Sequence, residues 1–499
     1  MKLPAPKLPL VILALTLLSA AAVTFFYSHG YLTYYGDAEA HLNIARRMID
    51  SRTPGYDQVG TVWLPLLHWA MLPLVRIDAL WRNALAGAIP SAIAFILSGG
   101  FLFASARRIF ACDRAALAAT ALWALNPNVL YLQSIPMTES LFSACLLALL
   151  YFTVRFRDTQ GCGSVVGAGI AACAGTLTRY EGWFLLALVT LYFLLTARRR
   201  IAVTAVFCAI AGLGPLFWFF HNWWLTMDPL AFYRGPYSPL AIQHGVDYPG
   251  YHNCREAFVY YRTAAQLSAG TCLPWIALAG AAAALYRRAF WALALLVLPG
   301  LFIMWSMHSS GGSPIFVPVL KPFSYYNSRY AITALPLLAV AAAALVAVVP
   351  ERARSAAALI VVIAAVAPWL LHPSPSTWIT WEESRVNSEA RRAWTHQAAD
   401  YLKPRYVRGS GILTGFGDLT GIYREMGIPL RDTFTGDNGL PFNATVLRPE
   451  LFLHEEWVVA MGGDDAQTAV MRAGLRGKAY LLENTIIVKD APVIEIYRR

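Results

Sequence analysis

The sequence predicts an α-helical polytopic membrane protein that ends in a small α/β domain. Of the 499 residues, 57% are hydrophobic and only 14% are charged, whereas a soluble chain carries roughly a quarter charged residues. The net charge of +11 does not indicate a nucleic-acid partner, because residues 372–499 hold 15 Lys and Arg against 16 Asp and Glu. The basic excess falls instead in short clusters between apolar runs, as in the cytoplasmic loops of membrane proteins.

About eleven membrane spans are expected, since a spanning helix needs about twenty mostly apolar residues. They are placed near residues 8–27, 83–106, 115–133, 139–156, 163–178, 182–197, 201–224, 266–286, 289–307, 331–349 and 355–371. For the first span, a small-residue patch leaves a cleaved signal peptide as the alternative, although the apolar run is long for one.

Basic clusters in alternate connections predict which loops face the cytoplasm. They lie at Lys2 and Lys7, Arg107, Arg108 and Arg114, Arg155 and Arg157, Arg198, Arg199 and Arg200, Arg287 and Arg288, and Arg352 and Arg354. The other connections, expected on the outer face, are residues 28–82, 134–138, 179–181, 225–265, 308–330 and the tail from 372. We therefore expect a multi-pass protein of the cytoplasmic (inner) membrane whose active site and C-terminal domain are extracytoplasmic.

The first outer loop opens with the acidic stretch that holds Asp37, Glu39 and His41. The apolar residues that follow recur at helical spacing, which predicts an amphipathic helix on the membrane surface with Asp37 at its N-terminal end. The alternative is that Asp37 is only an N-cap and Glu39 only complements the helix dipole. A second interfacial helix is expected near residues 60–69.

The later outer connections carry further polar side chains. Glu139 closes the short turn 134–139, and Arg179 and Glu181 lie in the tight turn 177–182. The longer loops 225–265 and 308–330 supply the remaining candidates, which are Arg262, Lys321, Tyr326 and Arg329.

The composition changes to that of a soluble domain beyond Pro373. Residues 411–421 and 457–474 each read as strand, turn and helix, and residues 479–497 read as β-strands, which predicts a small α/β domain. The expected domains are thus a transmembrane domain over 1–371, with amphipathic helices in its outer loop 28–82, and a soluble extracytoplasmic domain over 372–499.

Carboxylates, guanidinium groups and aromatic rings at the mouth of a membrane bundle suit group transfer from a lipid-linked sugar phosphate. A carboxylate can take the proton of the acceptor, and basic side chains can neutralise the phosphate that leaves. Arginine suits phosphate because its fork binds two oxygens at once.

Several short motifs resemble those of the GT-C membrane glycosyltransferases. Asp37 and its neighbours resemble the catalytic acid that follows the first span in that superfamily. The turns Pro136–Ser140 and Thr178–Gly182 are similar to the MTE-type and TRPEG-type turns of its bacterial members. Asn327–Tyr330, followed by Leu335–Pro336, resembles the RY…LP start of a late span. The resemblance extends over most of residues 1–370 and is to the protein O-mannosyltransferase and aminoarabinose transferase group.

The resemblance implies a role for each matching residue in an inverting single displacement. Asp37 would be the general base, and Glu39 or Glu139 would orient the acceptor or assist the base. Arg329, together with Lys321, would hold the donor phosphate. The other substrate-binding candidates are Tyr326, Arg179, Glu181, His41 and Arg262.

The chain also departs from the relatives' patterns. Residue 180 is Tyr where the related turn often has Pro. The lysine-proline-proline element of the aminoarabinose transferases and protein O-mannosyltransferases is missing, and the WWDYG signature of oligosaccharyltransferases is absent. Assignments of donor and acceptor from those subfamilies are therefore not carried over.

Each candidate has a structural alternative. Thr138 and Glu139 can simply cap and charge the start of the fourth span. Arg179 and Glu181 can form an ion pair that fixes their turn, and Lys321 and Arg329 can reach toward lipid headgroups.

No regular metal-ligand spacing is present, so no metal ligand is assigned. His41, His244, His252 and His308 with the first-loop acids leave a divalent cation (Mg or Mn) as an open cofactor. The seven cysteines contain no C-x-x-C pair, and Cys254 and Cys272, both expected outside, leave a disulfide open.

The predicted function is an inverting glycosyltransferase with a polyprenyl-phosphate-sugar donor and a glycan, lipid or protein acceptor. The alternatives are a transporter or flippase for a lipid-linked glycan, which should show matched half-repeats, and a non-catalytic membrane scaffold.

Overall fold

The computed structural model describes residues 8–243, 247–309, 312–415, 417–477 and 479–499. Lys2, Lys7, His244 and Gly311 therefore lie outside the described residues. The chain forms two compact units, each built from segments distant in sequence: Met1–Gly30, Thr61–Leu67 and Ala88–Glu383 in the first, and Tyr31–Gly60, His68–Gly87 and Ser384–Arg499 in the second. The expected domain boundary at residue 371 stays a prediction, whereas these units are discontinuous along the chain.

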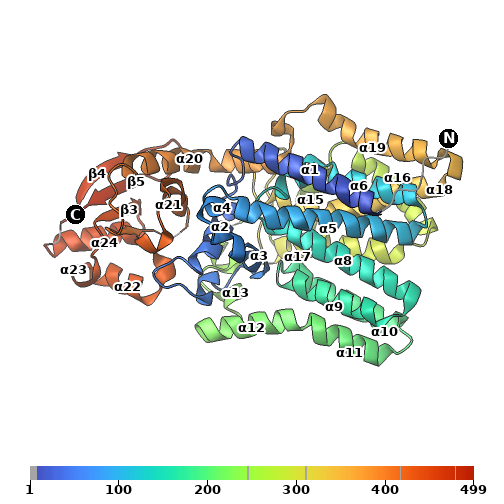
Figure 1. The fold of residues 1–499 in the computed structure, drawn as a ribbon, viewed down its shortest axis with the longest axis horizontal. Coiled ribbons are helices and arrows are strands. Elements are labelled where there is room, and N and C mark those ends of the chain that lie inside the picture. Colours follow the sequence, from blue (N-terminus) through green and yellow to red (C-terminus); the bar gives the residue numbers. More distant parts are fainter. Residues whose placement is uncertain (1–7, 244–246, 310–311, 416, 478) are drawn as a thin grey trace. The chain divides into compact units, whose positions relative to one another are not determined.

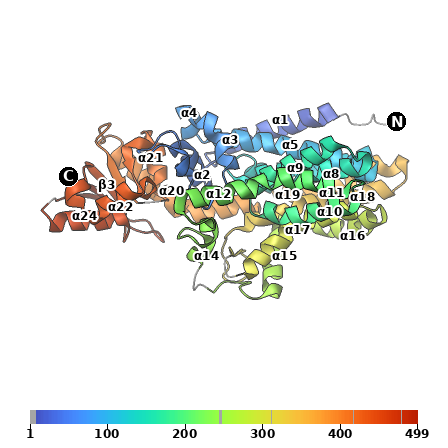
Figure 2. The same ribbon diagram turned by 90° about the horizontal axis from the view of Figure 1, so that it is seen from below.

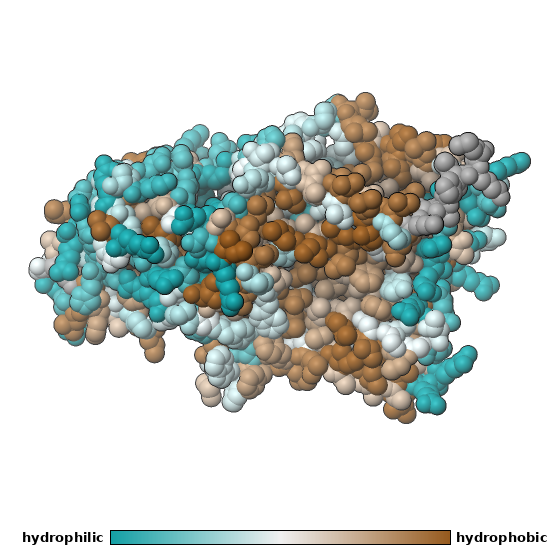
Figure 3. Space-filling model, viewed as in Figure 1, coloured by the Kyte–Doolittle hydropathy of each residue, from teal (hydrophilic) through white to brown (hydrophobic). Residues whose placement is uncertain are grey.

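The first unit is a bundle of helices (Figure 1). In chain order its helices are α1 (Leu8–Ser28), α5 (Leu85–Phe110), α6 (Asp113–Ala124), α7 (Pro127–Leu132), α8 (Thr138–Thr159), α9 (Cys162–Thr176), α10 (Glu181–Thr196), α11 (Arg200–Ala211), α12 (Leu213–Thr226), α13 (Ala231–Arg234), α14 (Pro239–Ile242), α15 (Cys254–Ala269), α16 (Leu273–Tyr286), α17 (Phe290–His308), the 3₁₀ helix η2 (Ser328–Ala334), α18 (Leu335–Val348) and α19 (Arg354–Leu371). Figure 3 shows apolar side chains gathered on the surface of these helices, as expected for a lipid-facing surface.

Seven helices among the described residues are long and apolar enough to span a membrane. They are Leu8–Ser28, Leu85–Phe110, Thr138–Thr159, Arg200–Thr226, Phe290–His308, Ser328–Val348 and Glu351–Leu371. The pair α15 and α16, bent by 102° at its break, gives an eighth if it is one span (Figure 2).

The polytopic helical fold is confirmed, but the count of eleven is not. The expected spans 163–178 and 182–197 correspond to α9 and α10, which have only 15 and 16 residues. The expected span 115–133 is divided into α6 and α7, because Pro127 begins a new helix whose N-cap side chain, Asn126, accepts a hydrogen bond from the Asn128 amide.

Three of the expected cytoplasmic connections meet at one end of the first unit. Arg108 at the end of α5 pairs with Asp158 at the end of α8 over 3.2 Å. Arg287, after α16, donates to the carbonyl oxygen of Phe110 over 2.8 Å. The alternation of basic clusters therefore corresponds to a common end of the bundle.

The second unit combines short helices with a five-stranded sheet. Its helices are α2 (Gly36–Arg47), α3 (Leu66–Val75, which begins in the first unit), α4 (Asp78–Arg82), α20 (Ile379–Leu402, which also begins in the first unit), α21 (Thr420–Met426), α22 (Leu440–Leu447), α23 (Pro449–Phe452) and α24 (Asp465–Leu475). The first outer loop thus packs with the C-terminal region. The apolar residues Ala38, Leu42 and Ala45 of α2 are fully buried there, so the expected membrane-surface helix instead packs inside the protein.

The sheet confirms the expected C-terminal α/β domain. Its strands are β1 (Ile412–Thr414), β2 (Thr433–Phe434), β3 (Trp457–Met461), β4 (Leu481–Ile486) and β5 (Ile494–Arg498), in the order β2-β1-β3-β5-β4. β2, β1 and β3 are parallel, whereas β5 is antiparallel to both β3 and β4. The interior strand β1, which lies between β2 and β3, is buried throughout, as parallel strands usually are.

All seven cysteines are free. Cys254 begins α15 and Cys272 follows its end. A helix of 16 residues is about 24 Å long, far more than the Cα separation that a disulfide allows. The structure therefore does not support the disulfide that the sequence left open.

Candidate active site

A cluster of ion pairs joins three of the expected outer connections in the first unit. Glu139 lies in the first turn of α8, Arg179 lies just before α10, and Arg329 lies in η2. Arg179 Nη1 is 3.0 Å from Glu139 Oε1, and its Nε is 2.8 Å from Glu181 Oε1. Arg329 Nε is 3.3 Å from Glu139 Oε1. Four of the predicted site residues thus come together.

The structure tests the alternative readings of these residues. Neither Thr138 nor Glu139 is the N-cap of α8, because that position is Met137 and it makes no side-chain cap bond. Glu139 does place its charge in the first turn of α8, where it complements the helix dipole. Arg179 and Glu181 do form the expected ion pair. Arg329 is only 6% exposed, so it does not reach out toward lipid headgroups.

The cluster also contains a carboxylate that the sequence analysis missed. Glu383, 1% exposed, accepts a hydrogen bond from the Ser328 amide over 2.8 Å and another from the Ser328 hydroxyl. Its Oε1 is 3.3 Å from Arg329 Nη1. Glu383 lies in α20, whose start is held because Thr380 donates its amide and hydroxyl to Asn128 Oδ1, each over 3.0 Å.

The charged side chains of the cluster are largely buried, with 1–2% of Glu139 and Glu383, 8% of Arg329 and 11% of Arg179 exposed. Burial would lower the pKa of Arg179, but Glu181 and Glu139 outweigh it and raise that pKa above its usual range, so Arg179 stays a cation. The guanidinium groups of Arg179 and Arg329 lie 4.8 and 5.2 Å from the ring of Tyr330, within cation–π range.

The two arginines lie at different distances from these carboxylates. Arg179 is 2.8 Å from Glu181 and 3.0 Å from Glu139, whereas Arg329 is 3.3 Å from an oxygen of Glu139 and 3.3 Å from an oxygen of Glu383. A guanidinium binds carboxylate and phosphate oxygens with the same planar fork. Arg329 can therefore exchange a carboxylate contact for a phosphate oxygen.

In the second unit, Asp37 is the second residue of α2 and is half-buried. Tyr35 occupies the N-cap and makes no side-chain cap bond. The N-cap alternative for Asp37 is therefore wrong, whereas its place in the first turn suits the positive end of the helix dipole.

Glu39, two residues after Asp37 in α2, is buried, and both of its carboxylate oxygens accept hydrogen bonds. Arg424 of α21 reaches Oε1 with Nε and Oε2 with Nη2, each over 2.7 Å, and Asn43 donates to Oε1 over 3.0 Å. Burial would raise the pKa of the Glu39 carboxyl, but Arg424 outweighs it and the pKa is lowered. Glu39 therefore serves as an anchor for α2, which leaves little capacity to assist a base.

His41 and His68 form a second buried contact in this unit. Nδ1 of His41 is 2.9 Å from Nε2 of His68, and burial, then His41 and Arg47, lower the pKa of His68 well below its usual range. Within the described ranges, no group of three or more His, Cys, Asp or Glu is placed to hold a metal ion. With both oxygens of Glu39 bound to Arg424 and His41 paired with His68, these residues do not fit a metal ion.

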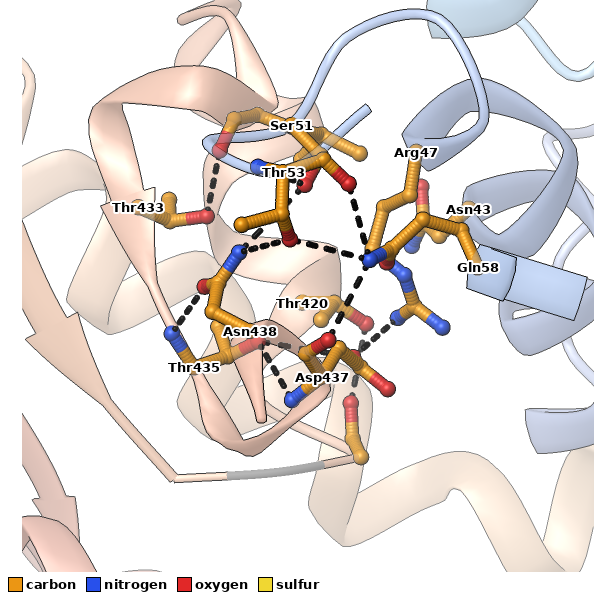
Figure 4. Close-up of polar contacts among 12 residues, drawn as sticks. Asn43, Arg47, Ser51, Thr53, Gln58, Thr420, Thr433, Thr435, Asp437 and Asn438 are labelled. Atoms are coloured by element: carbon orange, nitrogen blue, oxygen red, sulfur yellow. Dashed lines mark hydrogen bonds and ion pairs between the residues drawn. The ribbon is translucent and has the colours of Figure 1, made fainter. Parts of the chain in front are cut away.

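Figure 4 shows a further polar network between the first outer loop and the loop after β2. Arg47 pairs with Asp437 over 2.6 Å, and Gln58 donates to the Asp437 carbonyl oxygen over 3.2 Å. Asn438 donates to the Thr53 hydroxyl over 3.1 Å. Burial raises the pKa of the Asp437 carboxyl although Arg47 opposes the shift. The network ties the C-terminal end of α2 to the sheet domain.

The remaining predicted residues lie outside these clusters. Lys321 and Arg262 are exposed, and the backbone oxygen of Lys321 accepts a hydrogen bond from the hydroxyl of Tyr260. Tyr326 is 38% exposed, and its ring is tilted by 37° against that of Phe316, with ring centroids 5.7 Å apart. These three side chains stay candidates for contact with a lipid headgroup or acceptor.

Comparison with known proteins supports the predicted resemblance. Residues 65–224 match the sequence model of the dolichyl-phosphate-mannose-protein mannosyltransferase family. The structure is similar to that of ArnT from Cupriavidus metallidurans bound to undecaprenyl phosphate, with a TM-score of 0.55 and 14% identity. Its apo form gives a TM-score of 0.53 and 15% identity.

Both structural matches to ArnT cover 96% of this chain and 97% of the ArnT chain. No curated protein sequence matches the chain significantly. At these identities the structural similarity establishes the fold. The chain therefore has the fold of ArnT.

Proposed function

We propose that this protein is an inverting glycosyltransferase that moves a sugar from a polyprenyl-phosphate-linked donor to an acceptor at the outer face of the cytoplasmic membrane. The observation that carries the proposal is the buried charged cluster around Arg329 in a chain with the ArnT fold. The bound undecaprenyl phosphate in one ArnT structure supports a lipid phosphate as the leaving group.

Arg329 holds the donor phosphate in this proposal. Arg329 is 3.3 Å from Glu139 and 3.3 Å from Glu383, and a phosphate would bind the same guanidinium through two parallel charge-assisted hydrogen bonds. When phosphate takes the place of Glu139 or Glu383 on Arg329, the displaced carboxylate is free to accept a hydrogen bond from a hydroxyl of the sugar. Exposed Lys321 adds positive charge from the loop 308–330.

Asp37 is the general base. The acceptor hydroxyl gives its proton to the Asp37 carboxylate. At the same time the acceptor oxygen attacks the anomeric carbon of the sugar from the face opposite the phosphate. The bond between that carbon and the phosphate oxygen breaks, and its electron pair leaves with the polyprenyl phosphate. One displacement therefore inverts the configuration of the sugar.

The outer-face site rests on the distribution of charge. The connections that supply Glu139, Arg179 and Arg329 alternate along the chain with the basic connections at Arg108 and Arg287. Basic loops stay in the cytoplasm, so the acidic connections face the opposite side.

The test is turnover of the purified protein in nanodiscs with undecaprenyl-phosphate-linked sugars, supplied one at a time, with release of undecaprenyl phosphate measured by mass spectrometry. Removal of a general base lowers turnover by roughly 10²–10⁴-fold, which is expected for Asp37→Asn. Asp57→Asn, a change of an exposed aspartate in the same loop, should keep wild-type turnover.

Two results would contradict the proposal. Wild-type turnover by Asp37→Asn would remove the base. Movement of intact donor across the bilayer without release of undecaprenyl phosphate would show a flippase instead of a transferase.

A further inference from the structure

We propose that Arg424 of the C-terminal domain is a positioning residue, which fixes α2 through Glu39 and thereby sets the direction of Asp37. The inference rests on the proposed function, because it assigns Asp37 the role of base. It gives the C-terminal domain a part in the reaction without placing any of its residues on the substrate.

The geometry of the Arg424 side chain supports an anchoring role. Its two contacts with Glu39 are both 2.7 Å and engage both carboxylate oxygens. It also donates to the Arg82 carbonyl oxygen over 2.6 Å and to the Thr33 hydroxyl over 3.4 Å. One guanidinium thus joins three parts of the segment that leads into and out of α2.

Burial makes this contact specific. The side chain of Glu39 is 5% exposed and that of Arg424 is 15% exposed, so water has little access to either partner. A planar guanidinium that binds a carboxylate with two parallel bonds fixes orientation as well as distance. The pair therefore sets the rotation of α2 about its own axis.

The rotation of α2 matters because of where Asp37 lies. Each residue of an α-helix is rotated by about 100° from the one before it, so side chains two residues apart point about 160° away from each other. When Arg424 holds Glu39 on one side, Asp37 is directed to nearly the opposite side of the helix. The ion pair between Arg47 and Asp437 (Figure 4) holds the other end of α2, so the helix is restrained at both ends.

Hydrogen–deuterium exchange tests the anchor without any substrate. Arg424→Gln should speed exchange in residues 36–47 by at least about tenfold, since the buried bonds that restrain the first turn are lost. Glu425→Gln is the matched control, because this neighbouring carboxylate is exposed and bonds His396 on the surface. Unchanged exchange in Arg424→Gln would overturn the proposal.

Turnover tests the consequence for the reaction. Misplacing a reacting group by about 1 Å costs up to about 10²-fold, so Arg424→Gln should lower kcat by ten- to a hundredfold and leave KM for the lipid donor within threefold. In an Asp37→Glu background, where the base is already displaced, the further loss should be under threefold. An equal loss in both backgrounds would show that Arg424 does not act through Asp37.

Charge reversal guards against simple misfolding. The double variant Glu39→Arg with Arg424→Glu should turn over faster than either single variant, because it restores a pair of opposite charges. If the double variant were as slow as the single variants, this result would contradict the anchoring role. Full turnover by Asp37→Asn beside slow turnover by Arg424→Gln would contradict the proposed base. Wild-type turnover by Arg424→Gln beside inactive Asp37→Asn would overturn the positioning role alone.

Discussion

Replacement of Glu383 tests the buried cluster of the first unit most sharply. This carboxylate accepts from both the amide and the hydroxyl of Ser328 and lies 3.3 Å from the Arg329 guanidinium. Removal of one partner of a buried ion pair costs about 3–5 kcal/mol when the other charge is left without compensation. Arg329 keeps its contact with Glu139, but the Ser328 amide and hydroxyl both lose their acceptor. Glu383→Ala should therefore destabilise the protein by about 3 kcal/mol, the lower end of that range.

Glu383→Gln separates shape from charge. The amide keeps the size of the side chain and one oxygen that can accept a hydrogen bond from Ser328. Only the contribution of the negative charge to the hydrogen bonds with Ser328 and Arg329 is therefore lost. Hydrogen bonds to charged groups contribute about 1.5–3 kcal/mol, and that is the loss expected for this variant.

The assay is equilibrium unfolding in detergent micelles, followed by tryptophan fluorescence. Glu389→Gln on the same helix is the control, because its side chain is 72% exposed and its contact with Arg385 is 3.7 Å. Exposed pairs contribute about 0–1 kcal/mol. If Glu383→Ala proved as stable as Glu389→Gln, the cluster would not be a buried charged network.

Three further predictions concern pH, metal and topology. The pKa of the Glu39 carboxyl in the folded protein is lowered below its ordinary 4.5, so the stabilisation by this ionised group is present above pH 4.5 and is lost as pH falls through the lower folded-state pKa. The difference in unfolding free energy between wild type and Glu39→Gln should therefore shrink below pH 4.5. A difference that grew there would contradict the sign of the shift. Since the first-loop residues do not fit a resident metal ion, EDTA should leave turnover unchanged, and a loss restored by Mg²⁺ would be the opposing result. A membrane-impermeant maleimide should label exposed Cys254 in spheroplasts and exposed Cys162 only after permeabilisation; the reverse pattern would invert the topology.

The sequence predicted best what depends on local composition. Apolar runs located the membrane helices, and basic clusters located the end of the bundle where Arg108 meets Asp158. The span count exceeded the structural count because hydropathy averages over breaks. Pro127 ends one helix and starts another inside a single apolar run, and two apolar segments were simply too short.

Part of the site could also be predicted, since short turns constrain their own residues. Arg179 and Glu181 are two residues apart, and their ion pair follows from the turn that holds them. Motif order suggested that Glu139 and Arg329 share a side of the membrane, but sequence carries no distance between them.

The partners contributed by the C-terminal region could not be predicted. Arg424 lies 385 residues from Glu39, and Glu383 lies 54 residues from Arg329. Neither belongs to a motif, and in sequence each looks like an ordinary charge of a soluble helix. Only the folded chain shows that both are buried against earlier segments.

A map of the protein with undecaprenyl phosphate bound would test the central claim most directly. The proposal predicts phosphate density within about 3 Å of the Arg329 guanidinium, with at least one of its two carboxylate partners, Glu139 or Glu383, moved away from it. Phosphate density held elsewhere, with both ion pairs of Arg329 intact, would contradict it.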